Sequence, residues 1–191
     1  MKSTLINMIL SLLGITLVAS AGVGLVYQIT KEPIAQAAVA ATNTALADVL
    51  PAFDDTALKS LAIDDMPIDV YTAKQSGKVV GYAVKTMTKS GFSGAFVLMV
   101  GLTPDGKVIN VNVLSHAETP GLGSKMTEEG NPLLGGIQGK ELAKVDLHVS
   151  KDGGDVDALT AATITSRAYL DAIARAQKAY ELTLKGGGAN E

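Results

Sequence analysis

The stretch DVYTAKQSGKVVGYAVKT, residues 69–86, carries the strongest fold signal in the chain. Residues 69–74 and 78–86 alternate apolar with polar or small side chains, and a period of two is typical of a strand with one buried face. Gln75-Ser76-Gly77 separates the two runs, and a short glycine-containing loop favours a tight turn. The stretch therefore predicts a β-hairpin.

Further apolar runs extend this hairpin toward the C-terminus. Residues 94–102 (GAFVLMVGL) and 107–114 (KVINVNVL) are predicted to form two more strands, joined by the turn sequence Thr103-Pro104-Asp105-Gly106. A later run, Lys144–Val149, is predicted as a short strand that extends the sheet. The order of the four main strands indicates an antiparallel meander.

A helical pattern follows near the C-terminus. Between Thr165 and Leu184 apolar side chains recur at helical spacing, and Lys185 with the glycines after it is typical of a helix stop. Upstream of the hairpin, Phe53–Met66 is rich in aspartate with little pattern, so we expect a short helix or loop there. Together these elements predict an α+β fold in which helices pack against an antiparallel sheet. The apolar positions of the helix are Leu170, Ile173, Ala176 or Gln177, Tyr180 and Leu184.

The N-terminal end carries a long apolar segment. Residues 3–30 contain no charged side chain, and about 20 apolar residues suffice for a helix to cross a bilayer. A cleaved signal peptide is the alternative, because Ala19-Ser20-Ala21 resembles a cleavage site, but the apolar run continues to Tyr27 and favours a retained anchor. Lys2 precedes the segment, and this weak signal places the bulk of the chain outside the cytoplasm.

We expect four regions along the chain. Residues 1–31 form the transmembrane anchor, and residues 32–66 form a juxtamembrane helix and connector, in which Pro33 starts the helix and Pro51 stops it. Residues 67–185 form the α+β domain, and residues 186–191 form a flexible tail.

Composition excludes several functions. The 191 residues carry a net charge of −3 and no basic run, so a nucleic-acid-binding surface is poorly supported. The chain has no cysteine, which excludes disulfides, thiolate metal sites, iron–sulfur clusters and thiol nucleophiles. Any chemistry must use oxygen ligands, the two histidines or a bound cofactor.

The first candidate site is HAETPGLGSK, residues 116–125, which follows directly on the fourth predicted strand. Its glycines let backbone N–H groups approach a ligand closely, and His116, Glu118 and Thr119 add donors and acceptors. A planar polar ligand would suit this loop, although a plain Gly/Pro turn is the alternative. Zinc is disfavoured because His116 and Glu118 supply only two ligands.

Other patterns do not indicate catalysis. GGIQGKE, residues 135–141, lacks both the first glycine and the Ser or Thr of a phosphate-binding loop. Ser115 and His116 are neighbours on a strand and would face opposite ways. His148 stands alone on a predicted strand, where a structural role is expected.

The second candidate site is DALTAATITS, residues 157–166, which holds three threonines and a serine without a cysteine, histidine or lysine to activate them. One interpretation is helix capping, with Thr165 or Ser166 as N-cap. The other is a bound phosphate, which a helix start favours. A hydroxyl without a neighbouring base is a poor nucleophile, so a separate enzyme would have to attach that phosphate.

At these residues the chain resembles a known family. DALTAAT (157–163) resembles the flavinylation pattern D-x-x-(S/T)-G-A-T, with Ala161 where the family usually has glycine. HAETPGLG (116–123) resembles the second hallmark of the FMN-binding domain in the RnfG and NqrC subunits of membrane ion-translocating oxidoreductases. Gly-Phe-Ser-Gly (91–94) resembles the family's glycine-flanked strand start, and the resemblance is to RnfG more than to the longer NqrC.

The resemblance implies specific roles for individual residues. Thr163 would be joined through its oxygen to the phosphate of FMN by a separate flavin transferase that uses FAD. Asp157 and Thr160 would be recognition and positioning residues for that enzyme, and Ala162 would contact the cofactor. The residues implied to line the flavin ring are Glu118, Thr119, Gly121, Leu122 and Gly123.

The implied function is that of a membrane-anchored flavoprotein subunit in an Rnf-type complex. It would relay electrons through covalent FMN between ferredoxin and NAD⁺ while the complex moves Na⁺ or H⁺, as an electron-transfer subunit and not a complete enzyme. Its partners would be the integral membrane and iron–sulfur subunits, and its domain would lie on the periplasmic side of the inner membrane. The alternatives are a covalent-FMN carrier of another extracytoplasmic reductase and a cofactor-free anchored assembly module.

Overall fold

The computed structural model describes residues 4–187. The chain divides into two compact units, Met1–Thr42 and Asn43–Glu191. Two expectations fall partly outside the described residues: the start of the anchor, with Lys2, and the end of the flexible tail.

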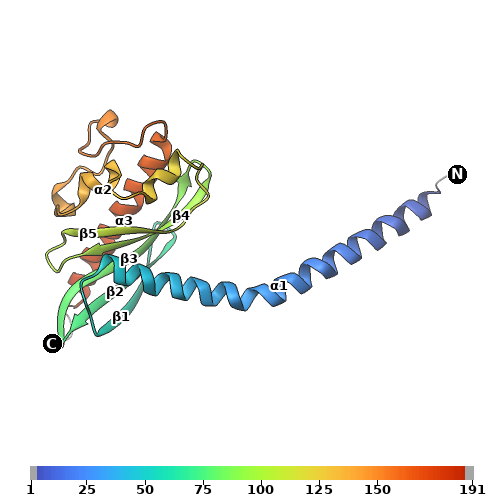
Figure 1. Cartoon of the computed structure of the whole chain (residues 1–191), viewed down its shortest axis with the longest axis horizontal. Helices are drawn as coiled ribbons and strands as arrows, with labels where there is room; N and C mark the ends of the chain where they lie inside the picture. Colours follow the sequence, from blue (N-terminus) through green and yellow to red (C-terminus); the bar gives the residue numbers. More distant parts are fainter. Residues whose placement is uncertain (1–3, 188–191) are drawn as a thin grey trace. The chain divides into compact units, whose positions relative to one another are not determined.

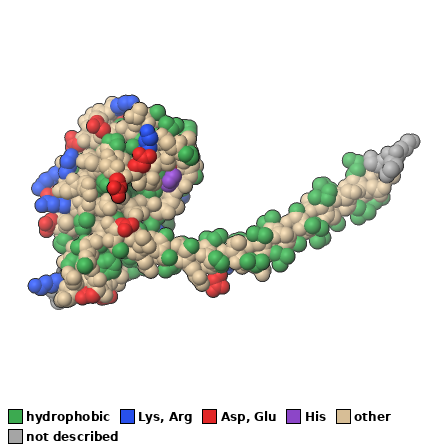
Figure 2. All heavy atoms as spheres, viewed as in Figure 1, with side chains coloured by type: hydrophobic (Ala, Val, Ile, Leu, Met, Phe, Trp, Pro, Cys, Tyr) green, Lys and Arg blue, Asp and Glu red, His purple; other side chains and the backbone are tan. Residues whose placement is uncertain are grey.

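The first unit is a single stretch of helix. It belongs to α1 (Leu5–Val49), which is 45 residues long and whose N-terminal part is apolar enough to cross a membrane. Figure 2 shows hydrophobic side chains around this segment, and those from Leu5 to Ile29 are largely exposed. The prediction that a separate helix starts at Pro33 is wrong, because α1 continues through Pro33.

The second unit contains a meander sheet. Within the described residues, five antiparallel strands lie in the order β1-β2-β3-β4-β5 (Figure 1). Their bounds are β1 Asp55–Ile63, β2 Met66–Gln75, β3 Lys78–Gly91, β4 Gly94–Leu102 and β5 Val108–Ser115. This sheet, packed by helices, confirms the predicted α+β class.

The prediction of a short helix or loop at Phe53–Met66 is wrong. Strand β1 occupies most of this stretch and pairs with β2 from Asp55↔Lys74 to Ile63↔Met66. Asp64 and Asp65 connect the two strands, and both have positive φ, 53° and 57°. Two such residues are typical of the type I′ turn of a two-residue hairpin, in which aspartate is tolerated.

One face of the sheet packs against α3 (Thr163–Gly187), the helix drawn in red in Figure 1. The helix is longer than predicted at both ends, and it includes residues 186 and 187 of the expected tail. Its buried side chains lie on one stripe, as the pattern predicted, although Leu184 is exposed. The buried members of the stripe include Leu170, Ile173, Ala176 and Tyr180.

The other face of the sheet packs against the C-terminal end of α1. Val49 and Leu50 are buried there with Ala83 and Met99 of the sheet. A Cβ on Gly101 would lie 1.9 Å from the carbonyl oxygen of Val49. Glycine is required at this position because the end of the helix lies directly on the strand.

The segment between β5 and α3 forms the end of the domain that carries the candidate sites. It contains α2 (Pro132–Ile137) and three 3₁₀ turns, Gly123–Thr127, Leu142–Lys144 and Ser150–Asp152. The predicted strand at Lys144–Val149 is wrong: apart from an isolated bridge between Val149 and Val156, these residues do not join the sheet.

Candidate functional site

The two candidate motifs meet at one pocket. Its volume is about 300 Å³, within the range of small-molecule sites. The loop after β5 forms one wall, the start of α3 forms a second, and the β3–β4 turn contributes a third. The lining residues are Phe92, Glu118, Thr119, Leu122, Gly123, Ala161, Ala162, Thr163, Ile164 and Thr165.

Glu118 is the polar centre of this pocket. The residue is only 4% exposed. Oε2 accepts a hydrogen bond from the Thr165 hydroxyl at 2.8 Å, and Oε1 accepts one from the backbone N–H of Ser93 at 3.2 Å. One carboxylate therefore connects the loop after β5, the β3–β4 turn and the first turn of α3.

Two glycines leave room for this carboxylate. A Cβ on Gly123 would lie 2.5 Å from Glu118 Oε2 and 2.8 Å from Thr165 Oγ1. A Cβ on Gly91 would lie 2.7 Å from Glu118 Oε1. Side chains at either position would displace Glu118, which explains why the motif has glycine at residue 123.

The tip of the loop after β5 has a compact local fold. Gly121 adopts a φ of +73°, and its N–H donates to the Ser124 hydroxyl at 2.9 Å. The N–H groups of Leu122 and Ser124 both donate to the carbonyl of Thr119, at 3.2 and 3.3 Å. These bonds fix Thr119 and Leu122 on the pocket wall, while Gly121 lies beside the pocket and does not line it.

The hydroxyl groups at the start of α3 have different environments. The Thr165 hydroxyl is buried against Glu118, and the Ser166 hydroxyl donates to Ala162 O and accepts from Leu159 N–H, both at 2.9 Å. Neither residue is the N-cap, since α3 already begins at Thr163, so that interpretation is wrong. Thr163 is partly exposed and lines the pocket, and within the described residues its hydroxyl makes no hydrogen bond.

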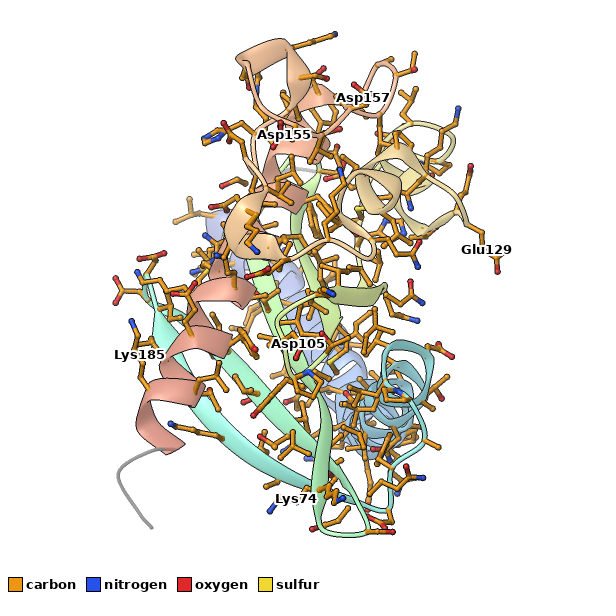
Figure 3. The ribbon with its side chains drawn as sticks, turned by 90° about the vertical axis from the view of Figure 1, so that its left-hand side faces the viewer. Lys74, Asp105, Glu129, Asp155, Asp157 and Lys185 are labelled. Atoms are coloured by element: carbon orange, nitrogen blue, oxygen red, sulfur yellow. The ribbon has the colours of Figure 1, made fainter. Side chains whose placement is uncertain are left out.

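Asp157 and Thr160 lie just outside the pocket. Both are exposed, and Figure 3 shows Asp157 on the segment that leads into α3. Asp157 Oδ1 accepts a hydrogen bond from the Ser150 hydroxyl at 2.6 Å, which anchors this segment. The two residues are accessible to another macromolecule but do not line the cavity.

The backbone conformation of Ala161 explains why the flavinylation pattern usually has glycine at this position. Its φ is +60°, in the left-handed region that costs roughly 1–2 kcal/mol for a residue with a Cβ. The residue is exposed at the pocket edge, so its methyl group fits without a clash. The loop shape is therefore kept at some cost in backbone strain.

Three lining residues were missed by the sequence reasoning. Phe92, 67% exposed, lies in the β3–β4 turn, and Ile164, 49% exposed, lies in the first turn of α3. Thr165, predicted from the sequence as a possible N-cap, lines the pocket as well. The exposure of Phe92 marks it as a candidate contact for a ligand, but this exposure is known only from the structure.

His148 does not belong to this site. The prediction that it lies on a strand is wrong: it is exposed, and its Nδ1 lies 2.5 Å from Asp146 Oδ1. The hydrogen bond to Asp146 raises the pKa of His148 above its usual value.

The pocket fits a planar group that carries a phosphate. Ser166 is the first residue whose N–H bonds back along α3, to Ala162 O at 3.0 Å. The N–H groups of Thr163 to Thr165 therefore lack partners within the helix, which favours an anion beside Thr163. Phe92 and Leu122 supply apolar surface for a ring, and Glu118 and Thr119 supply polar groups.

Comparisons with known proteins agree with this fit. A family model described as FMN-binding domain matches residues 91–178, which include both motifs. The RnfG subunit of the ion-translocating oxidoreductase complex from Pseudomonas aeruginosa is 33% identical over 194 residues, covering 95% of this chain and 88% of that protein. The chain belongs to the RnfG family.

Other relatives support the assignment. The RnfG protein of Shewanella amazonensis is 34% identical over 188 residues, covering 92% of this chain and 87% of that protein. That of Shewanella oneidensis is 41% identical over 116 residues, or 59% of this chain and 54% of that protein. Membership confirms the predicted resemblance to RnfG and the prediction of an electron-transfer subunit in place of a complete enzyme.

Proposed function

We propose that the chain carries FMN covalently attached to Thr163 and relays electrons through it in an Rnf-type complex. The observation that carries the proposal is the position of Thr163, which places a free hydroxyl in the pocket at the start of α3. The FMN-binding family match supports the cofactor, and the relatives named as complex subunits support the assembly.

The environment of the neighbouring hydroxyl groups supports Thr163 over the other candidates. The hydroxyl groups of Thr165 and Ser166 are buried and hydrogen-bonded, and Thr160 lies outside the pocket. An ester at Thr163 would place its phosphate beside the free N–H groups of the helix start, where the helix dipole favours negative charge.

Attachment requires a second enzyme. Among the described residues that line the pocket there is no histidine, lysine or cysteine to deprotonate Thr163. We infer that a flavin transferase supplies the base and that FAD is the donor. The Thr163 oxygen forms a bond to the flavin-side phosphorus, the pyrophosphate bond breaks, AMP leaves, and the hydroxyl proton passes to the transferase. Asp157 and Thr160, exposed beside the acceptor, fit recognition by that enzyme.

The pocket residues hold and shield the ring. When bound, FMN supplies the electron-carrying chemistry. Phe92, Leu122 and Ile164 provide apolar contacts that exclude water from one side of the ring. Thr119 and those backbone N–H groups of the loop after β5 that make no bond within the loop would contact its polar edge. The covalent tether would keep the ring within reach of neighbouring carriers.

The location and the partners belong to the same proposal. The apolar part of α1 spans the inner membrane and packs against integral subunits, and the domain lies on the periplasmic side. The complex transfers electrons between ferredoxin and NAD⁺, with iron–sulfur subunits as partners, and couples this transfer to Na⁺ or H⁺ movement.

In-gel flavin fluorescence after denaturation tests the attachment. The full chain, produced with the transferase, should give a fluorescent band, and Thr163→Ala should abolish it. Thr160→Ala should weaken the band, whereas Thr183→Ala, remote on α3, should leave it unchanged. A fluorescent Thr163→Ala band would contradict the proposed site.

In-gel fluorescence and co-purification together separate the alternative functions. A dark wild-type band in the presence of active transferase would favour a cofactor-free assembly module. A fluorescent chain that does not co-purify with integral subunits from its native membrane would favour a carrier for another extracytoplasmic reductase.

A further inference from the structure

Glu118 contacts all three walls of the flavin pocket through hydrogen bonds. Its Oε1 accepts from Ser93 N–H in the β3–β4 turn, and its Oε2 accepts from the Thr165 hydroxyl in α3. Its own backbone N–H donates to His116 Nδ1 at 3.2 Å in the loop after β5. We name this set of Glu118, Ser93 and Thr165 the Glu118 latch.

The surroundings of the latch are shaped for a carboxylate. Within the described residues, no lysine or arginine lies within salt-bridge distance of Glu118. The residue is 4% exposed, so the two hydrogen bonds replace the water that its carboxylate has lost. Gly91 and Gly123 leave space for its two oxygens at 2.7 and 2.5 Å from the positions where their Cβ atoms would lie. A buried polar network whose groups are hydrogen-bonded holds its members in one arrangement.

We propose that Glu118 is a positioning residue that forms the flavin pocket before the flavin arrives. The proposal rests on the proposed flavin site, but the latch consists of contacts within this chain alone. By holding Thr165, Glu118 fixes the first turn of α3, and Thr163 lies two residues earlier in the same turn. The latch thereby presents the Thr163 hydroxyl in one orientation to the transferase.

Conservative variants separate hydrogen bonding from shape and from charge. Thr165→Val keeps the shape of the buried side chain and removes the donor, whereas Thr165→Ser keeps the donor. Glu118→Gln keeps both bonds, because its amide oxygen accepts from Ser93 N–H and its NH₂ donates to Thr165 Oγ1. Glu118→Leu removes both bonds. Thr183→Val, which breaks a bond to Ala179 O elsewhere on α3, is the matched control.

Amide hydrogen exchange measures whether the pocket is preformed. The full chain is produced without the transferase and studied in detergent micelles. Thr165→Val should accelerate exchange about tenfold at the hydrogen-bonded amides of two segments, residues 118–127 and 159–166. This is the change expected when a buried hydrogen bond to a carboxylate is lost. Exchange in strands β2 and β3 should not change, and Thr165→Ser and Thr183→Val should match the wild type.

Two results would overturn the proposal. One is exchange in Thr165→Val that equals the wild type in both segments. The other is a Glu118→Gln chain that exchanges as fast as Glu118→Leu, because charge and not hydrogen bonding would then be essential. If Thr165→Val also accelerates exchange in β2 and β3, the comparison of Glu118→Gln with Glu118→Leu tests the proposal. Equal exchange rates in these two variants would then overturn it.

The rate of flavin attachment provides a second readout. With the transferase and FAD present, intact mass should show that Thr165→Val gains FMN about tenfold more slowly than the wild type, while Thr165→Ser keeps the wild-type rate. If Thr165→Val gains FMN at the wild-type rate, the Glu118 latch does not orient the Thr163 hydroxyl for the transferase. If the wild-type chain gains no FMN, the proposed function fails. The hydrogen-exchange experiment still tests the Glu118 latch, because it uses the chain without the transferase.

Discussion

The hydroxyl of Thr165 lies 2.8 Å from Oε2 of Glu118, although 47 residues separate them in the chain. This contact joins the two sequence motifs into one pocket, whose wall also contains Thr163. It explains why neither motif is a complete site alone. The loop after β5 supplies the carboxylate, and the start of α3 supplies the hydroxyl groups and the free N–H groups.

The strained backbone at Ala161 predicts a stabilising substitution. Ala161→Gly should raise the free energy of unfolding by up to about 1 kcal/mol, because a φ of +60° costs a residue with a Cβ more than it costs glycine. Ala174→Gly, at an exposed position in the middle of α3, should lower it by about 1 kcal/mol. Urea unfolding of both variants measures the difference, and a loss of stability in Ala161→Gly would contradict the assigned backbone strain.

The contact between Gly101 and Val49 predicts a strongly destabilising substitution. Gly101→Ala should lower the free energy of unfolding by about 2–3 kcal/mol, because the new Cβ would lie 1.9 Å from the Val49 carbonyl oxygen. Gly135→Ala in α2, where no atom lies within 4 Å of the added Cβ, should be neutral or slightly stabilising. Equal effects of the two substitutions, measured by denaturant unfolding, would refute the direct packing of the α1 end on β4.

The ion pair of Arg175 and Asp171 predicts an asymmetric response. Arg175 has a side chain only 7% exposed, whereas Asp171 is 45% exposed. Asp171→Ala should lower the free energy of unfolding by about 3 kcal/mol, because it leaves the buried Arg175 guanidinium with only the Met87 carbonyl as partner. Arg175→Met should cost less, since the remaining Asp171 carboxylate reaches water. Thermal unfolding that ranks the two variants in the opposite order would contradict this account.

The pair of His148 and Asp146 predicts a pH dependence. The pKa of His148 is raised above its usual value of 6.5 by the hydrogen bond to Asp146 and by its charge. The protonated form therefore stabilises the folded chain below about pH 6.5, and this contribution is lost as the pH rises through the folded-state pKa. Asp146→Asn should lower the pKa of His148 in an NMR titration. Its stability deficit should be present at about pH 5.5 and absent at about pH 9, and a deficit independent of pH would exclude the ion pair as its cause.

Local sequence signals accounted for much of the fold. The β2–β3 hairpin was predictable because Ser76-Gly77 separates two alternating runs, and α3 was predictable from its apolar stripe. Strand β1 was missed because Leu58 faces solvent, 58% exposed, and because Asp64-Asp65 is a less familiar turn sequence than one with glycine. The false strand at Lys144–Val149 has strand-like composition, but residues 145–149 lie between two 3₁₀ turns and make only an isolated bridge, from Val149 to Val156.

The two motifs of the site could be predicted from the sequence, but the way in which they pack against each other could not. Thr163, Glu118, Thr119, Leu122 and Gly123 were named from the sequence and line one pocket. The pairing of Glu118 with Thr165 depends on tertiary packing, which no local pattern records. For the same reason Phe92 and Ile164, which reach the pocket from separate elements, could not be assigned before the fold was known.

Peptide mapping by mass spectrometry of the chain purified from its native membrane tests the central claim most directly. The account predicts that the peptide containing residues 157–166 carries the added mass of one FMN less water, with fragmentation placing it on Thr163. An unmodified Thr163 in material from cells with an active flavin transferase would contradict the account.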